Sequence, residues 1–104
     1  MFTVIETDDF GRAADKLLTE VEKGKLRAFV AEHPTQGVAI PGTGGIRKLR
    51  WAAKGRGKRG GARIIYFVQL ERGLIYLLLA YSKSEQEDLT PNQRRELAAI
   101  VATL

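Results

Sequence analysis

The sequence predicts one α+β domain, in which helices cover a mainly antiparallel sheet. Two long apolar runs, 62–70 and 74–81, are separated by a short Glu-Arg-Gly segment, which is typical of a β-hairpin. Apolar residues recur at helical spacing near both ends of the chain. The length of 104 residues fits a single domain spanning 1–104, which can bury a core without disulfides or structural metals.

The first third of the chain is expected to form one strand and two helices. Residues 2–6 favour a strand, and the Thr-Asp-Asp segment after them can cap a helix. Apolar residues at helical spacing predict a helix over 9–22, which Gly24 is expected to end. A second helix over 25–32 is expected to stop at His33, because a residue before proline disfavours helix.

The middle of the chain is expected to be a loop followed by a strand. Residues 35–45 are rich in glycine and form the loop, with Val38 and Ile40 as anchors in the core. The strand covers 45–52, and a polar hairpin loop, 53–61, leads from it into the first apolar run. The three central strands therefore form an antiparallel meander, and the two apolar runs are expected to be buried on both faces.

Residues 90–93 carry the signals that are typical of the start of a helix. Thr90 can cap the helix, Pro91 suits its first position, and Gln93 completes a capping box. The predicted order of elements is thus β-α-α-β-β-β-α.

The net charge of +5 is concentrated in one stretch, 42–63, because no Asp or Glu lies between Glu32 and Glu71. Strand alternation places Lys48 and Arg50 on one face of the sheet. A basic strand with a glycine-rich tip suits a phosphate backbone. The candidate RNA-binding residues are Arg47, Lys48, Arg50, Arg56, Lys58 and Arg59.

Composition excludes several classes of site. The chain has no cysteine, so it holds no disulfide, zinc-thiolate site or thiol nucleophile. Its one histidine, His33, is more often a solvent-exposed capping residue in such a position than a catalyst. The longest apolar run is far shorter than the ~20 residues of a membrane helix, and no signal peptide is apparent. We therefore expect a cytoplasmic protein without membrane partner, metal or cofactor.

Four segments, in order, resemble a known family: GTGG, RK-hydrophobic-R, GKRGG-x-R-hydrophobic-hydrophobic-Y and Y-x-K-x-E, between residues 42 and 93. In this combination the sequence is similar to the RelE/ParE superfamily of toxins from bacterial type II toxin–antitoxin systems, above all to its HigB branch. The resemblance spans nearly the whole domain. It implies a RelE-like fold and an endoribonuclease (mRNA interferase) that cuts mRNA on the translating ribosome. It also implies a helix-turn-helix antitoxin of the HigA kind as partner.

The resemblance further implies a site on one face of the central sheet. Lys48 and Arg50 match the family's basic second strand. The candidates for catalysis are Arg63, Lys83, Tyr81 and Lys54. Two departures weaken the match: Ser84 stands where relatives often carry asparagine or arginine, and no tyrosine follows Tyr81.

These residue types suit metal-independent RNA cleavage. The RNA 2′-hydroxyl attacks the adjacent phosphate, which requires a base, an acid and positive charge on the phosphoryl oxygens. Crowding by like charges makes a lysine of the cluster, Lys83 or Lys54, a candidate for proton transfer. Arg63 can hold the phosphate through two bonds at once. Tyr81 either contacts the RNA, by stacking or by positioning the 2′-hydroxyl, or is only a core-edge aromatic.

Two other functions stay open from the sequence. A ParE-like toxin would keep the fold but inhibit DNA gyrase through protein contacts. A non-catalytic RNA-binding module would bind RNA tightly without cutting it. The basic cluster at the strand ends favours the endoribonuclease, because inhibition by protein contact does not require such a cluster. Trp51 is expected to pack in the core rather than to stack on a base, because it alternates with Leu49.

Overall fold

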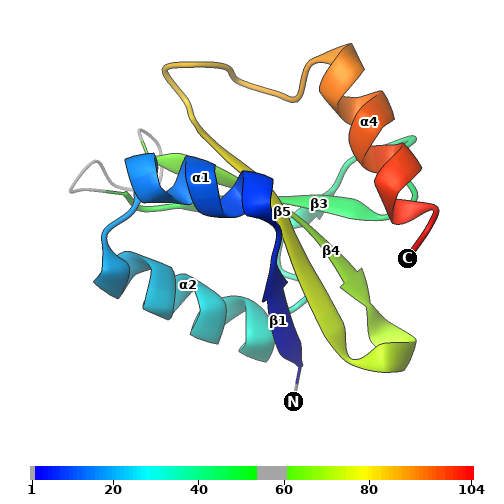
Figure 1. Ribbon diagram of the computed structural model, residues 1–104, viewed down its shortest axis with the longest axis horizontal. Helices are drawn as coiled ribbons and strands as arrows, with labels where there is room; N and C mark the ends of the chain where they lie inside the picture. Colours follow the sequence, from blue (N-terminus) through cyan, green and yellow to red (C-terminus); the bar gives the residue numbers. More distant parts are fainter. Residues whose placement is uncertain (1, 54–60) are drawn as a thin grey trace.

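The computed structural model describes residues 2–53 and 61–104. In this part of the chain, three α-helices surround a five-stranded sheet with the strand order β1-β5-β4-β3-β2 (Figure 1). The elements are β1 (Thr3–Glu6), α1 (Asp8–Leu17), α2 (Glu20–Glu32), β2 (Val38–Ala39), β3 (Ile46–Trp51), β4 (Ala62–Gln69), the short 3-10 helix η1 (Leu70–Arg72), β5 (Leu74–Ser82) and α4 (Pro91–Val101). The predicted α+β class and the single domain are confirmed.

The sheet is antiparallel except at one edge. β3, β4 and β5 form the predicted meander, in which β4 pairs with both neighbours. β1 joins the sheet beside β5 in a parallel register that sets Thr3 opposite Leu74. The hydroxyl of Thr7, directly after β1, donates to the carbonyl oxygens of Leu77 and Leu78 and fixes the entry into α1. The sequence predicted β1 but not its parallel partner.

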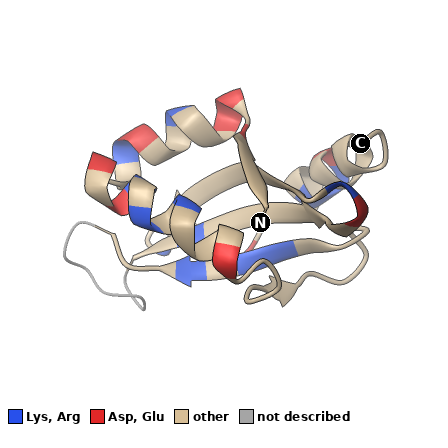
Figure 2. Cartoon of the chain, turned by 90° about the horizontal axis from the view of Figure 1, so that it is seen from below, with Lys and Arg blue, Asp and Glu red and all other residues tan. Residues whose placement is uncertain are grey.

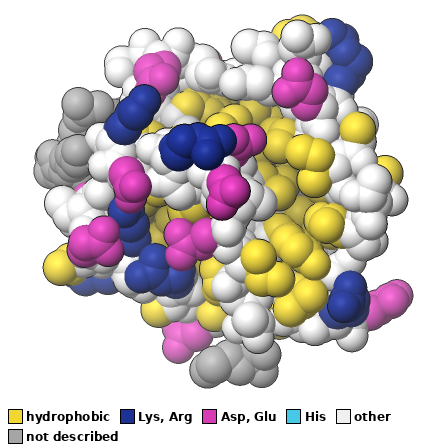
Figure 3. Space-filling view, in the orientation of Figure 1, with side chains coloured by type: hydrophobic (Ala, Val, Ile, Leu, Met, Phe, Trp, Pro, Cys, Tyr) yellow, Lys and Arg dark blue, Asp and Glu magenta, His cyan; other side chains and the backbone are white. Residues whose placement is uncertain are grey.

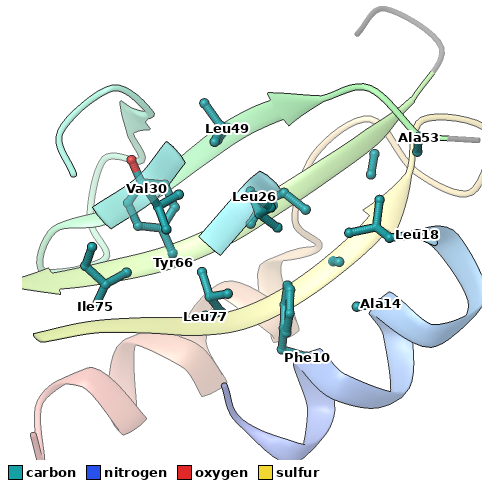
Figure 4. Close-up of a cluster of buried hydrophobic side chains, with 13 residues drawn as sticks. Phe10, Ala14, Leu18, Leu26, Val30, Leu49, Ala53, Tyr66, Ile75 and Leu77 are labelled. Atoms are coloured by element: carbon teal, nitrogen blue, oxygen red, sulfur yellow. The ribbon is translucent and has the colours of Figure 1, made fainter. Parts of the chain in front are cut away.

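Two hydrophobic clusters lie on opposite faces of the sheet. α1 and α2 cover one face, where Phe10, Leu26 and Tyr66 are among the buried residues (Figure 4). α4 covers part of the other face, through Leu97 and Val101. Successive residues of β4 enter the two clusters in turn, as strand geometry requires. The prediction that this run is buried on both faces is confirmed.

The break between the first two helices is not where the sequence placed it. α1 ends at Leu17, and α2 begins at Glu20 and continues through Gly24. Thr19 forms a capping box: its hydroxyl accepts from the Glu22 N–H, and the Glu22 carboxylate accepts from the Thr19 N–H. The prediction of a break at Gly24 is wrong because this cap starts a new helix earlier, and burial of the following turns holds the glycine within it.

The segment 35–45 also departs from the expectation. It contains the edge strand β2, and Val38 is 73% exposed, so it does not anchor the loop in the core. The anchor is Gly37, whose N–H donates to the buried hydroxyl of Tyr66 at 2.8 Å. Ile40 does pack against the cluster beneath α4. The expectation for Val38 is wrong because hydrophobicity does not indicate the real anchor. The loop is held by a hydrogen bond to a residue 29 positions away.

The helix signals at the other boundaries are confirmed. Thr90 caps α4, Pro91 stands at its start, and Gln93 closes the capping box. His33 caps the C-terminus of α2, before the proline. Within the described ranges, no helix has the length and apolar character needed to cross a membrane.

Replacing Gly24 by alanine should raise the free energy of unfolding by about 0.5–1 kcal/mol. Gly24 lies inside α2, and the nearest atom to a Cβ there would be the end of the Arg27 side chain, at 4.0 Å, an ordinary contact distance. Alanine lowers the entropy of the unfolded chain and gains helix propensity. Urea denaturation followed by far-UV circular dichroism measures the effect. A fall in stability would contradict the placement of Gly24 within a continuous helix.

Candidate nucleic-acid interface

One row of side chains crosses the three central strands on the face opposite α1 and α2. The register sets Arg50 of β3 opposite Arg63 of β4, and Arg63 opposite Tyr81 of β5. Because paired residues share a face, these three candidates lie side by side. Lys48 stands two residues before Arg50 and belongs to the same face. Figure 2 shows the basic positions along β3, the strand that leads into the grey segment, and acids mainly on the helices above.

Arg47 points to the other face of the sheet, where it holds a loop in place. Its guanidinium donates to the carbonyl oxygens of Gly37 at 2.7 Å and Thr35 at 3.3 Å. These bonds tie the loop before β2 to β3. The predicted alternation of the strand is thus confirmed, and it separates Arg47 from the row. Arg47 is a structural residue of this loop in the free protein.

Arg63 and Tyr81 are buried. Arg63 is 2% exposed and Tyr81 is 3% exposed. An arginine is rarely buried so completely unless its charge is compensated, and Arg63 does make polar interactions. A phosphate must therefore reach a residue that the free protein covers.

The Tyr81 hydroxyl lacks a hydrogen-bond partner within the described part of the chain, although it is buried. Burial raises the pKa of the Tyr81 phenol to about 12; the nearby Asp88 also raises it, and Arg63 lowers it. At neutral pH the group is therefore protonated and can donate a hydrogen bond. A buried donor without an acceptor destabilises the folded state. Such unsatisfied groups are rare in native structures, and some of them serve a functional role.

An ion pair that the sequence did not indicate spans this face. The Lys48 ammonium donates to the Asp88 carboxylate at 2.6 Å, which joins β3 to the segment after β5. The hydrogen bond from Lys48 lowers the pKa of Asp88, as do the charges of Lys48, Arg94 and Arg63. Only the fold reveals this contact, because the two residues are 40 positions apart and an acid in a polar loop carries no pattern of its own.

The remaining candidates lie at the margins. Lys83 directly follows β5 and is exposed, and its N–H donates to the Gly61 carbonyl oxygen. Beside the row, Lys48 and Arg50 border an open hollow of about 560 Å³ that Gln36 and Val38 also line. The predicted residues that lie outside the described ranges are Lys54, Arg56, Lys58 and Arg59.

Two aromatic residues serve structure. The Trp51 ring lies 5.3 Å from that of Phe29, with the rings tilted, and packs against the cluster beneath α2. The prediction that Trp51 packs rather than stacks on a base is supported by this contact. The His33 ring also lies against Phe29, at 4.9 Å, and Phe29 packs on the sheet face opposite the row.

The face seen in Figure 3 is largely apolar. Hydrophobic side chains gather there between α1, β1 and α4, with several charged side chains around them. A pocket of about 190 Å³ lies between α1 and α4, with Leu78 and Leu79 beneath it and Asp9 and Glu96 beside it. The lining of this pocket includes no residue of the cationic row, the name used from here on for Arg50, Arg63 and Tyr81.

Tyr81→Phe should leave the free energy of unfolding unchanged or raise it by up to about 2 kcal/mol, and it should slow the RNA cleavage that the sequence resemblance predicts. The substitution keeps the packed ring and removes a buried hydroxyl that has no partner in the described ranges. Thermal unfolding and a single-turnover cleavage assay measure the two effects. A variant that is less stable but cleaves at the wild-type rate would show that the hydroxyl serves only structure.

A family model described as the RelE toxin of the RelE / RelB toxin–antitoxin system matches residues 3–104. The match runs from the first residue of β1 past the end of α4. It agrees with the resemblance seen in the sequence and with the α+β fold. The chain belongs to the RelE toxin family, whose members act in toxin–antitoxin systems and are countered by an antitoxin.

Proposed function

We propose that this toxin is a HigB-like endoribonuclease that cleaves mRNA on the translating ribosome in the cytoplasm. The observation that carries the proposal is the row Arg50–Arg63–Tyr81 with Lys48 on the same sheet face. Cations fixed by paired strands can stabilise charge that develops on a phosphoryl group without having to reorganise. A row of this kind has no evident use in a toxin that inhibits gyrase through protein contact alone.

The proposed reaction needs no group beyond the RNA and the protein. The 2′-oxygen attacks phosphorus, the bond from phosphorus to the 5′-oxygen breaks, and a 2′,3′-cyclic phosphate forms. A base takes the 2′-hydroxyl proton, and an acid protonates the leaving 5′-oxygen. Arg63 binds the phosphoryl oxygens, where its planar pair of donors matches two acceptors.

Tyr81 and the lysines have different parts in this scheme. Because the pKa of the Tyr81 phenol is raised, the group stays protonated at neutral pH; it can donate a hydrogen bond and is not available as a base. It thus orients an RNA oxygen beside Arg63. Lys83 and Lys54 are the candidates for moving the proton. Arg56, Lys58 and Arg59 contribute general contacts to the phosphate backbone.

Primer extension on mRNA from cells that produce the toxin tests the proposal. We expect new 5′ ends within translated reading frames, and none with Arg63→Ala or Lys83→Ala proteins that remain folded. Unchanged mRNA together with inhibited supercoiling by gyrase would favour a ParE-like toxin. Tight RNA binding without cleavage, even with ribosomes supplied, would favour a non-catalytic binding module.

The antitoxin is proposed to be a helix-turn-helix protein of the HigA kind. The family gives an antitoxin as partner, and the sequence resemblance to the HigB branch suggests its type. A small helix-turn-helix protein encoded in the adjacent reading frame, and its co-purification with the toxin, would support this assignment. An adjacent antitoxin of another fold would contradict it.

A further inference from the structure

The segment 83–90, here called the strap, crosses the cationic row. It leaves the end of β5 and runs to the start of α4 (Figure 1). Asp88 of the strap reaches Lys48 on β3, although β4 lies between β5 and β3. The strap therefore passes over the β4 end that carries Arg63. Leu89 packs in the same cluster as Tyr81, and Asp88 lies close enough to Arg63 for their charges to interact.

Hydrogen bonds hold Asp88 in this position. The Gln86 amide donates to the Asp88 carbonyl oxygen at 2.9 Å and to the Gln93 side-chain oxygen at 2.8 Å. That Gln93 oxygen also accepts from the Thr90 N–H at 2.9 Å, within the capping box of α4. At the other end, the Ser82 hydroxyl bonds to Glu85. These hydrogen bonds shape the strap so that the Asp88 carboxylate faces Lys48.

The carboxylate takes the place that suits a phosphate. It bonds to Lys48, and Arg94 of α4 and Arg63 of β4 also act on it electrostatically. A phosphate oxygen makes the same charge-assisted hydrogen bonds to lysine and arginine as a carboxylate oxygen does. The Asp88 side chain is 64% exposed and that of Lys48 is 24% exposed. Because the Asp88 carboxylate is open to solvent, an anion from solution can reach the pair and compete for Lys48.

We propose that the Asp88 carboxylate fills a phosphate subsite formed by Lys48 and Arg94, and that an RNA phosphate displaces it. Displacement frees the strap to move away from Arg63 and Tyr81. The inference rests on the proposed function for its ligand, RNA. It explains how Arg63 and Tyr81, which are buried in the free toxin, meet the substrate. In this scheme the Lys48–Asp88 ion pair is a latch that closes the site when RNA is absent.

Binding of a 2′-O-methyl RNA oligonucleotide, which cannot be cleaved by 2′-hydroxyl attack, tests the subsite. Asp88→Asn should bind at least about fivefold more tightly in fluorescence anisotropy, because Lys48 is then free for phosphate. Glu87→Gln is the matched control: it removes one negative charge from the same strap and leaves the latch intact. Equal gains from the two variants would reduce the effect to net charge and overturn the proposal.

A double-mutant cycle locates the effect. In the Lys48→Met background, which keeps the apolar stem, Asp88→Asn should no longer tighten binding. An undiminished gain in that background would show that Asp88 does not act through Lys48. Arg94→Gln should weaken binding more in the Asp88→Asn protein than in the wild type, since only the open subsite uses it; an equal loss in both would remove Arg94 from the subsite.

Hydrogen exchange on the free toxin separates the latch from the RNA hypothesis. Amides of residues 83–90 should exchange faster in Asp88→Asn and at the wild-type rate in Glu87→Gln. Equal protection in Asp88→Asn would overturn the latch. If the strap opens but no variant binds RNA, the phosphate subsite fails together with the proposed function.

Discussion

Arg63→Lys should cleave RNA on the order of 10²–10³ times more slowly than the wild type while binding it with similar affinity. Arg63 is central in the row, between Arg50 and Tyr81, and is held by paired strands on both sides. Lysine keeps the positive charge but lacks the planar pair of donors that bonds two phosphoryl oxygens together. The loss should therefore appear in the rate of the chemical step, which single-turnover cleavage of ribosome-bound mRNA measures.

The control for this result is Arg72→Lys. Arg72 lies in η1, between β4 and β5 and at the opposite end of these strands from Arg63, and it is exposed. That variant makes the same chemical change at a distance from the row and should cleave at the wild-type rate. Circular dichroism confirms that both proteins fold. Near wild-type cleavage by a folded Arg63→Lys protein would remove Arg63 from the catalytic residues.

Tyr66→Ala should lower the free energy of unfolding by about 3–5 kcal/mol, a large share of the stability of a small domain. Tyr66 is fully buried in the cluster beneath α1 and α2, and its hydroxyl is the acceptor for the Gly37 N–H. Alanine leaves a cavity and also a buried donor without a partner. Urea denaturation gives the change directly.

Comparing Tyr66→Phe with Tyr81→Phe separates the ring from the hydroxyl. Phenylalanine at position 66 keeps the packing and removes only the acceptor for Gly37, which should cost about 1–3 kcal/mol. The same substitution at position 81 removes a hydroxyl without a partner in the described ranges and should cost nothing. Similar losses at both positions would show that the hydrogen bond to Gly37 contributes little.

The central sheet could be predicted because its signals are local. Runs of apolar residues and an intervening glycine specify β4, β5 and the turn between them, and alternation specifies the two faces of β3. The helix boundaries were less accurate. At Gly24 the residue type suggested an end, but the capping box at Thr19 and burial along α2 determine the real boundary. The edge strand β2 has only two residues and forms by pairing with β3. No local sequence pattern therefore predicts it.

The shared sheet face of Lys48 and Arg50 could be predicted, but the arrangement of the whole row could not. Strand periodicity correctly grouped Lys48 and Arg50, and register brought Arg63 and Tyr81 beside them. The burial of Arg63 and Tyr81 is a property of the folded chain that no local pattern in the sequence indicates. Asp88 was missed for the same reason, since its contact with Lys48 exists only after the sheet has formed.

The parallel edge strand also constrains how the toxin is made. β1 leaves the ribosome long before its sheet partner β5, with which it pairs so that Thr3 lies opposite Leu74. Pairings so distant in sequence form slowly and need most of the nascent chain. Until β5 emerges, β1 and the first apolar run lack their partners, and such incomplete states are prone to misassociation. A nascent chain of this toxin therefore stays without its finished sheet until β5 has left the ribosome.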